Sequence, residues 1–125
     1  MENDRFKFRV WDKVSKKYRH YLYLDQCGDL RYPRDRGIKG CEMVTLEDRL
    51  NYTIEQCTGF RDKTGKLIYE NDVLLFFERL RGVVKWEHGG WFVSGEGIYQ
   101  PLCDAYASAE VVGNIHDAEA KGGEE

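Results

Sequence analysis

The clearest structural signal in the sequence lies at residues 82–93, Gly-Val-Val-Lys-Trp-Glu-His-Gly-Gly-Trp-Phe-Val. Two runs rich in β-branched and aromatic residues are separated here by Gly89 and Gly90, a pair that favours a tight turn between antiparallel strands. Trp86 and Trp91, one on each side, are typical of cross-strand aromatic pairs. We therefore predict a β-hairpin in this stretch.

The segments on either side of this hairpin also show short extended runs bounded by turns. Before it, residues 67–69 and 73–77 are apolar, and residues 62–66 form a polar, glycine-containing turn. After it, residues 98–102 and 110–115 have room for one strand each. Short strands with frequent turns and no long amphipathic helix predict an all-β fold, a small barrel or sandwich with at most one or two short helical turns.

The N-terminal region carries a second hairpin signal. Residues 5–11 alternate between basic and mostly apolar side chains, a period of two that is typical of a half-buried strand. We expect the apolar set, Phe6 included, to face the core. The polar residues 12–17 then turn the chain into another extended run at residues 18–24.

Two regions are ambiguous. Residues 33–40 hold two glycines, one proline and several charges, and we predict a surface loop there. In residues 45–57 the apolar positions recur both every fourth and every second residue, so helix and strand remain open. We favour a short helical turn at residues 45–49 followed by a strand at residues 50–57.

Length and composition set further expectations. The chain has 125 residues, of which 42% are hydrophobic, 33% charged and 14% aromatic, values that fit one domain, expected over residues 1–116. Residues 117–125 hold four acids and one lysine, so we expect a disordered acidic tail. With neither a signal peptide nor an apolar run of membrane-spanning length, we expect a cytoplasmic protein that does not enter the membrane.

Charge is distributed unevenly along the chain. Residues 1–66 carry 15 Lys and Arg against 11 Asp and Glu, whereas residues 67–125 carry 4 against 11. Opposite charges of this kind complement each other either within one fold or across a contact between subunits. We expect a homo-oligomer or a protein partner, and no small-molecule substrate is indicated.

Cysteine and histidine spacing argues against a metal site. The four cysteines include no C-x-x-C pair, and the three histidines are scattered, whereas zinc ligands usually come in close pairs. We therefore expect no metal and no cofactor, and reduced, mostly buried thiols.

The acidic and histidine residues give a weak case for catalysis. Asp62, Glu70 and Asp72 form the one compact acidic group, but they fall at predicted turns, where aspartate bonds nearby backbone amides. His88 is followed by no recognisable nucleophile arrangement. We therefore expect the protein not to be an enzyme, and rank a small hydrolase last.

Two binding hypotheses remain. Seventeen aromatic residues are more than one small core readily hides, which favours a protein-binding or self-assembling module. The alternative is a nucleic-acid-binding protein, because basic residues near tyrosines can hold phosphates and stack on bases. Its contacts would be seven basic residues within fifteen positions: Arg5, Lys7, Arg9, Lys13, Lys16, Lys17 and Arg19.

Four ordered segments carry a family resemblance. Residues 56–73, Gln-Cys-Thr-Gly-Phe-Arg-Asp-Lys-Thr-Gly-Lys-Leu-Ile-Tyr-Glu-Asn-Asp-Val, resemble the central signature of the YopX family, small proteins mostly encoded by bacteriophages and prophages. Residues 6–12 resemble its opening K-F-R-A-W-D. Residues 82–92 are similar to its G-x-V-x-W segment and aromatic continuation, and residues 110–115 to its closing E-V-I-G-N-I.

The sequence departs from the family pattern at several points. Cys57 stands where an aromatic or small polar residue is usual, and Asn71 replaces the glycine of the E-G-D turn. The N-P-E-L-L ending is absent after Ile115, and residues 13–55 match no motif of the family.

The resemblance implies a mostly β protein with an element like the small barrel of Src-homology-3 domains, acting as a phage or prophage accessory protein in the bacterial cytoplasm. It brings no catalytic residue. We expect the signature to specify turns and core, with Asn71 left-handed at its turn. Residues expected at turns are Thr58, Gly59, Asp62, Gly65, Asn71, Asp72 and Gly113. Residues expected in the core are Ile68, Tyr69, Val73, Trp86 and Val111.

Overall fold

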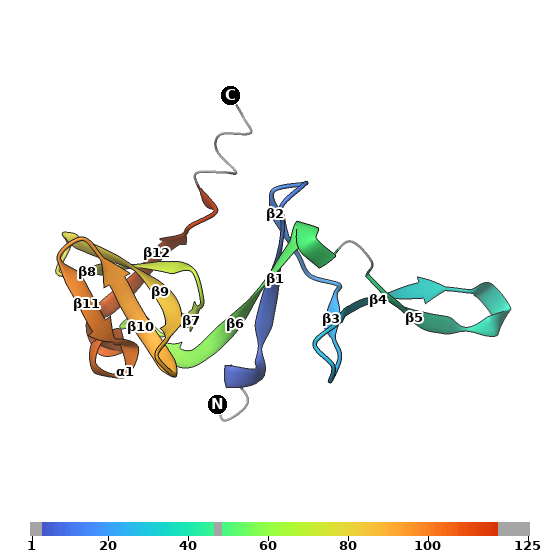
Figure 1. The fold of residues 1–125 in the computed structure, drawn as a ribbon, viewed down its shortest axis with the longest axis horizontal. Coiled ribbons are helices and arrows are strands. Elements are labelled where there is room, and N and C mark those ends of the chain that lie inside the picture. Colours follow the sequence, from blue (N-terminus) through green and yellow to red (C-terminus); the bar gives the residue numbers. More distant parts are fainter. Residues whose placement is uncertain (1–3, 47–48, 118–125) are drawn as a thin grey trace. The chain divides into compact units, whose positions relative to one another are not determined.

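The computed structural model describes residues 4–46 and 49–117, which form two compact units (Figure 1). The inserted unit is Arg9–Ile54. The barrel unit combines Met1–Phe8 with Glu55–Glu125, so the inserted unit interrupts it in sequence. Of the predicted acidic tail, only Asp117 lies within the described residues.

The barrel unit contains a curled, wholly antiparallel sheet of five strands in the order β11-β10-β9-β8-β12 (Figure 1). The hairpin predicted at residues 82–93 is confirmed, with Val84 opposite Val93 and Trp86 opposite Trp91. The predicted all-β, barrel-like fold is confirmed as a half-barrel. The strands are β8 (Asp72–Phe76), β9 (Leu80–Glu87), β10 (Gly90–Gly95), β11 (Ile98–Pro101) and β12 (Ala109–Asn114).

Two tight turns shape this sheet. His88 and Gly89, both with positive φ (52° and 79°), join β9 to β10, as the twist of a two-residue hairpin requires. Phe77 and Glu78 also have positive φ (52° and 64°) and join β8 to β9.

The core of the barrel unit lies against one face of the sheet. A short helix, α1 (Leu102–Ala105), follows the extended Pro101 and continues into the 3₁₀ turn Tyr106–Ser108. Ile68 is in the core as predicted. Trp86 is not: its side chain is 57% exposed near the end of β9 and packs edge-on against Trp91. The buried cluster is Ile68, Leu74, Phe76, Val84, Val93, Leu102, Ala105 and Ala109.

Thr58 and Gly59, which were predicted at a turn, lie instead in a bulge within a strand. β6 (Tyr52–Arg61) pairs with β7 (Leu67–Tyr69), and its register shifts between Cys57 and Arg61. Thr58 and Gly59 lie in that irregular stretch, where Thr58 Oγ1 donates to Ile68 O at 2.8 Å. The extra residues of a bulge give the same glycine signal as a turn.

Gly113 was also expected at a turn, and that expectation is wrong. It lies within β12, where the register against β8 shifts between Val111 and Gly113. By contrast, Gly65 (φ 92°) and Asn71 (φ 71°) are at turns with left-handed backbones, as predicted.

β1 (Phe8–Asp12), of which residues 9–12 belong to the inserted unit, pairs with β2 (Lys17–Arg19), which confirms the N-terminal hairpin in outline. The strand does not extend back to residue 5. Asp4–Phe6 forms a 3₁₀ turn in the barrel unit, and Phe6 is 66% exposed rather than in the core.

The rest of the inserted unit is a three-stranded sheet in the order β3-β4-β5. β3 (Tyr23–Leu24) is separate from β2, so residues 18–24 are not one strand. β4 (Leu30–Asp35) and β5 (Cys41–Thr45) form a hairpin, and the predicted loop at residues 33–40 is shortened by the strand pairing of residues 33–35.

Two further expectations need correction. The helical turn favoured at residues 45–49 is instead the 3₁₀ turn Arg49–Asn51, and residues 47–48 lie outside the described residues; the strand that follows begins at Tyr52. Of the four cysteines, Cys57 alone is buried; Cys27 lies in an exposed turn, Cys41 begins β5, and Cys103 lies on the exposed side of α1.

Candidate binding site

Asp62, a candidate for acid–base chemistry, is fully occupied as a turn acceptor. Its Oδ1 accepts hydrogen bonds from Thr64 N (2.8 Å), Thr64 Oγ1 (2.7 Å) and Lys66 N (2.9 Å), and its Oδ2 accepts one from Val111 N (2.8 Å). Burial raises the pKa of Asp62, but the hydrogen bonds from Val111, Thr64 and Lys66 outweigh it and leave that pKa below its ordinary value. This carboxylate therefore fastens the turn to β12.

The other acid–base candidates lie elsewhere: Glu70 in the turn between β7 and β8, Asp72 at the start of β8, and His88 in the turn between β9 and β10. Asp72 is buried, and its Oδ2 accepts a hydrogen bond from Tyr69 N at 2.8 Å. Glu70 Oε1 accepts one from Gln56 N at 3.4 Å. His88 is exposed in the β9–β10 turn. The structure thus does not bring Asp62, Asp72 and His88 together around one cleft.

A buried polar cluster was missed by the sequence analysis. Glu55 is fully buried in β6, and its Oε2 lies 2.7 Å from His116 Nε2 and accepts a hydrogen bond from Asn71 Nδ2 at 2.8 Å. Lys85 Nζ donates to Asn71 Oδ1 at 3.3 Å. A buried carboxylate is tolerated only with such partners. Because these residues are far apart in sequence, no local sequence pattern predicts that they come together.

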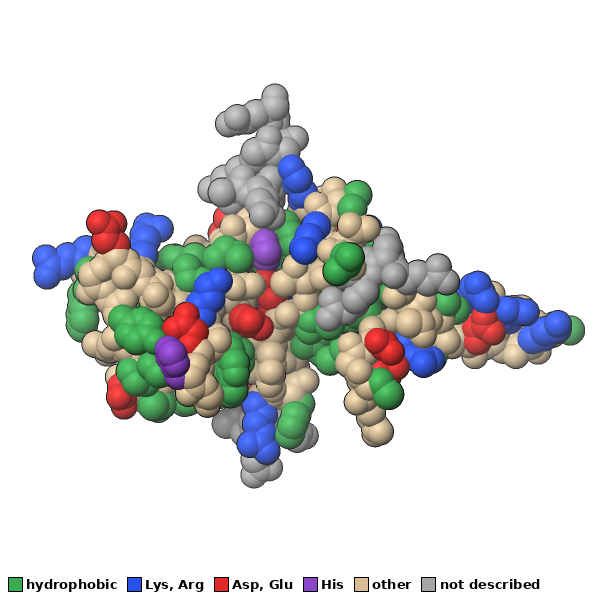
Figure 2. Space-filling view, in the orientation of Figure 1, with side chains coloured by type: hydrophobic (Ala, Val, Ile, Leu, Met, Phe, Trp, Pro, Cys, Tyr) green, Lys and Arg blue, Asp and Glu red, His purple; other side chains and the backbone are tan. Residues whose placement is uncertain are grey.

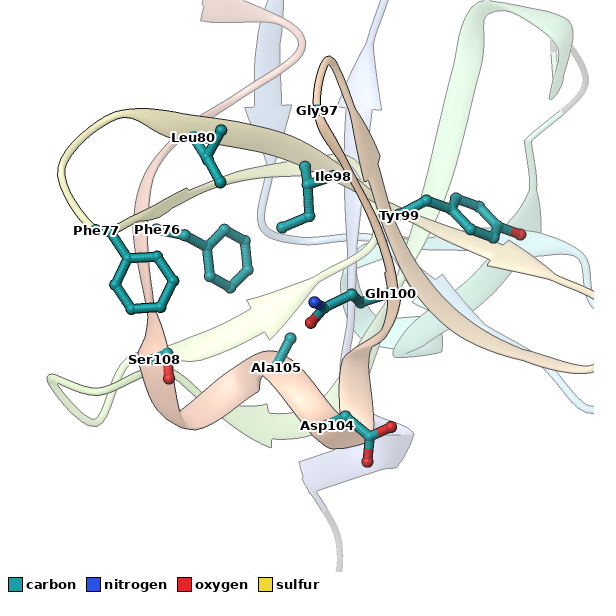
Figure 3. A pocket seen from close by; sticks show the side chains of 10 residues that line it. All are labelled: Phe76, Phe77, Leu80, Gly97, Ile98, Tyr99, Gln100, Asp104, Ala105 and Ser108. Carbon is teal, nitrogen blue, oxygen red and sulfur yellow. The ribbon is translucent and has the colours of Figure 1, made fainter.

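The barrel unit has an open pocket of about 450 Å³ between the β8–β9 turn, β11 and α1 (Figure 3). In Figure 3, Phe76, Leu80 and Ile98 point into the hollow from different strands and form an apolar lining. The polar residues Gln100, Asp104 and Ser108 complete it. Such a combination of an apolar floor and a few polar groups is typical of binding sites.

Phe77 lies at this pocket in an unfavourable conformation. Its side chain is 72% exposed, although it is among the largest apolar groups of the unit, and its φ is 52°. A bulky residue with positive φ is an outlier that the surrounding structure must enforce. The sequence signal was the pair Phe76-Phe77 at a strand end, where only one ring can face the core.

Aromatic side chains continue from the pocket along the sheet. Tyr99 is 53% exposed and stacks on Phe92 with ring centroids 5.3 Å apart, while its hydroxyl donates to Glu87 Oε2 at 3.0 Å. Figure 2 shows several hydrophobic side chains at the surface of the barrel unit. Several aromatic side chains of this unit are therefore exposed, as the aromatic content of the sequence led us to expect.

The seven basic residues predicted to bind nucleic acid are divided between the two units. Arg5 and Lys7 belong to the barrel unit, and the other five to the inserted unit. Arg5 lies over the Phe6 ring, and Lys7 pairs with Asp4 at 3.2 Å.

Within the inserted unit, several of these residues have protein partners. Arg19 pairs with Asp12 at 2.8 Å, Arg9 lies over the Tyr18 ring, and Lys13 Nζ donates to Leu50 O at 3.2 Å. Lys16 and Lys17 are exposed at the β1–β2 turn and the start of β2. A role in nucleic-acid binding stays a prediction.

Among residues 4–46 and 49–117, no group of three or more His, Cys, Asp or Glu side chains is placed to hold a metal ion. Across the same described part of the chain, no helix has the length and apolar character needed to cross a bilayer.

These features define a small all-β protein of two compact units, with an open pocket of mixed apolar and polar lining in the half-barrel. The profile of the YopX protein family matches residues 7–119. The chain therefore belongs to the YopX family, as the four sequence segments indicated.

Two solved structures are similar to this chain. Protein EF1440 from Enterococcus faecalis is 22% identical with a TM-score of 0.58, and protein yopX from Bacillus subtilis is 19% identical with a TM-score of 0.57. Each alignment covers 90% of this chain and 94% of the other. At this identity the likeness concerns the fold. A comparison with curated protein sequences finds no match.

Proposed function

We propose that this protein is a non-catalytic binding module whose barrel unit accepts an apolar side chain of a protein partner in the pocket beside Phe77. The observation that carries this proposal is the exposed Phe77 ring, held at positive φ next to an open pocket of about 450 Å³ that has both apolar and polar lining residues. Apolar side chains gathered at an exposed pocket favour an interaction site, and residues in strained backbone conformations are found more often at such sites than elsewhere.

The state of the acidic groups supports a non-catalytic role. Asp62 receives four hydrogen bonds, and Glu55 is buried against His116 and Asn71. General acid–base catalysis needs a group within reach of a substrate proton. Asp104 lines the pocket at the surface, where a carboxylate attracts a basic group of the partner.

The setting that we propose is the cytoplasm of a bacterium during phage or prophage life. The bacterial source of both similar structures supports a bacterial host, and the resemblance to a mostly phage-encoded family supports the phage origin.

The proposal is tested by selecting displayed random heptapeptides against the purified full chain. We expect the enriched peptides to share a large apolar residue and to lose binding to Ser108→Arg, which places a long charged side chain at the pocket. Ala107→Arg is the matched control, because Ala107 is exposed in the same 3₁₀ turn but is not part of the lining. Peptides that bind both variants as they bind the original chain would refute the proposal.

A nucleic-acid contact on the inserted unit is the second candidate. A hollow of about 180 Å³ is lined by Tyr21, Tyr32 and Tyr52 together with Arg19, a combination suited to stacking on bases. Binding of single-stranded DNA should then fall with added salt and with Lys16→Glu, but not with Lys66→Glu in the barrel unit. An absence of salt-sensitive binding at low ionic strength would eliminate this candidate.

A further inference from the structure

The β4–β5 hairpin of the inserted unit ends in an exposed apolar residue. Ile38 occupies the middle of the 3₁₀ turn Gly37–Lys39, and its side chain is fully exposed. The turn is well closed: Arg36 N donates to Gly40 O at 2.8 Å, and Asp35 Oδ1 accepts a hydrogen bond from Gly37 N at 2.8 Å. The Ile38 tip, residues 36–40, is therefore a hydrogen-bonded turn that holds one aliphatic side chain in solvent, rather than a loose loop.

The outer part of the hairpin that carries this tip is not packed against other residues of the unit that the structure describes. Its outer residues, 33–41, are all exposed, although residues 33–35 pair with residues 41–43 of β5. A two-stranded ribbon that is solvated on both faces is only marginally stable in water. Contact with another protein surface would stabilise it.

The net charges of the two units indicate what kind of protein surface the hairpin would contact. Residues 9–54 carry ten Lys and Arg against seven Asp and Glu, a net charge of +3, whereas the remainder of the chain carries nine against fifteen, a net charge of −6. Figure 2 shows Lys and Arg side chains along the β4–β5 hairpin. Arg34 and Arg36 pair with Glu42 of the same hairpin, and Lys39 is exposed beside Ile38.

The pocket of the barrel unit has the complementary character. Phe76, Leu80 and Ile98 offer an apolar lining, and Asp104 lies on the same pocket within a unit of net negative charge. Every copy of the chain therefore carries both an exposed aliphatic side chain, Ile38, on a basic hairpin and a partly apolar pocket on an acidic unit.

We infer that the pocket receives the Ile38 tip of a second copy of the chain. Ile38 enters the apolar hollow, and Lys39 lies toward the Asp104 carboxylate. This inference rests on the proposed function, because it names the occupant of the same pocket. The contact joins two different surfaces, so successive copies form either a closed ring, a reciprocal dimer included, or an open filament.

The test is sedimentation velocity of the full chain and its variants over a range of concentrations. We expect the original chain to self-associate and Ile38→Asp to weaken the association by roughly 10- to 100-fold, the effect of losing one buried aliphatic side chain. Val14→Asp is the matched control, because Val14 is also an exposed aliphatic residue in a turn of the inserted unit and should associate as before. Circular dichroism of each variant shows whether it is folded.

A mixing experiment separates this contact from others. Ile38→Asp keeps the pocket and Ser108→Arg keeps the tip, so at a concentration at which each variant alone is monomeric and the original chain is associated, their equimolar mixture should give a dimer and nothing larger. A monomeric original chain, or association that Ile38→Asp leaves unchanged, would overturn the inference. If the selected heptapeptides then still lose binding to Ser108→Arg, the proposed function stands and only the self-association is wrong. If they bind Ser108→Arg as well as the original chain, the proposed function is refuted together with the self-association.

Discussion

His116 Nε2 lies 2.7 Å from Glu55 Oε2, and both side chains are buried. His116 follows β12, whereas Glu55 lies in β6 at the start of the Glu55–Glu125 segment of the barrel unit, so this contact joins residues from the two ends of that segment. Asn71 donates to the same Glu55 oxygen, and Asn71 O accepts from Ile115 N at 3.0 Å. The cluster thus ties three segments of the unit together.

Replacing His116 should therefore destabilise the protein. We expect His116→Ala to lower the free energy of unfolding by about 2–4 kcal/mol, since it removes a partner from a buried carboxylate. His116→Gln should cost less, because a carboxamide N–H can donate to the same oxygen. Urea unfolding measures both, and an alanine variant as stable as the original chain would show that Glu55 does not depend on His116.

The lowered pKa of Asp12 leads us to expect that the stability of the protein falls at acid pH. Burial raises the pKa of Asp12, but hydrogen bonds from Ser15, Arg19 and Val14 outweigh it and lower that pKa to about 2. Because the folded pKa is depressed, the stabilisation is present above about pH 4 and is lost as the pH falls toward 2.

We therefore compare the original chain with Asp12→Asn by thermal unfolding across this range. The stability advantage of the original chain should shrink by about 1–2 kcal/mol between about pH 5 and about pH 2. An advantage that does not change with pH would contradict the role given to this carboxylate.

Two glycines in β10 differ in the space around them. A Cβ on Gly95 would collide with the carbonyl oxygen of Arg81 and with Gly82 Cα, whereas a Cβ on Gly90 meets nothing closer than the Phe92 ring at 3.8 Å. Gly95→Ala should cost about 1–3 kcal/mol of stability, and Gly90→Ala should stay within about 0.5 kcal/mol of the original. Equal melting temperatures for the two variants would mean that β9 and β10 do not approach as closely as described.

Phe77 should show a conflict between stability and binding. Asparagine tolerates the left-handed backbone better than phenylalanine, so Phe77→Asn should leave the unfolding free energy unchanged or raise it by up to about 1 kcal/mol. The same change removes an apolar ring from the pocket and should weaken the binding of selected peptides.

Glu78→Asn provides the comparison, because Glu78 shares the turn and the positive φ but does not line the pocket. It should gain similar stability and keep peptide binding. If the two variants bind equally well, the Phe77 ring is not part of the site.

Local features were predictable from the sequence. The hairpin at residues 82–93 depends on a two-residue turn between aromatic strands, and the left-handed Asn71 depends on a single turn position, so both were recognised. Thr58, Gly59 and Gly113 were assigned to turns because glycine marks bulges as well, and the difference lies in the register of a partner strand. Trp86 has the pattern of a core residue, but it lies beyond the part of β9 that the core cluster covers.

The candidate site depends on contacts that no local pattern encodes. The pocket combines a turn, an edge strand and a short helix spread over residues 76–108, and Glu55 meets His116 across 61 positions. The exposed Ile38 was within reach of the sequence, since it is the one apolar residue among the charges of residues 34–40. Its significance needs the closed hairpin that holds it outward.

The central claim is that the pocket beside Phe77 binds an apolar side chain of a protein. The most direct measurement is a methyl NMR titration of the isoleucine-labelled Ile38→Asp chain with a selected heptapeptide. Ile98 lines the pocket, whereas Ile68 is buried in the core, so the Ile98 methyl signal should shift while that of Ile68 stays in place. A bound peptide that leaves the Ile98 signal unmoved would contradict the claim.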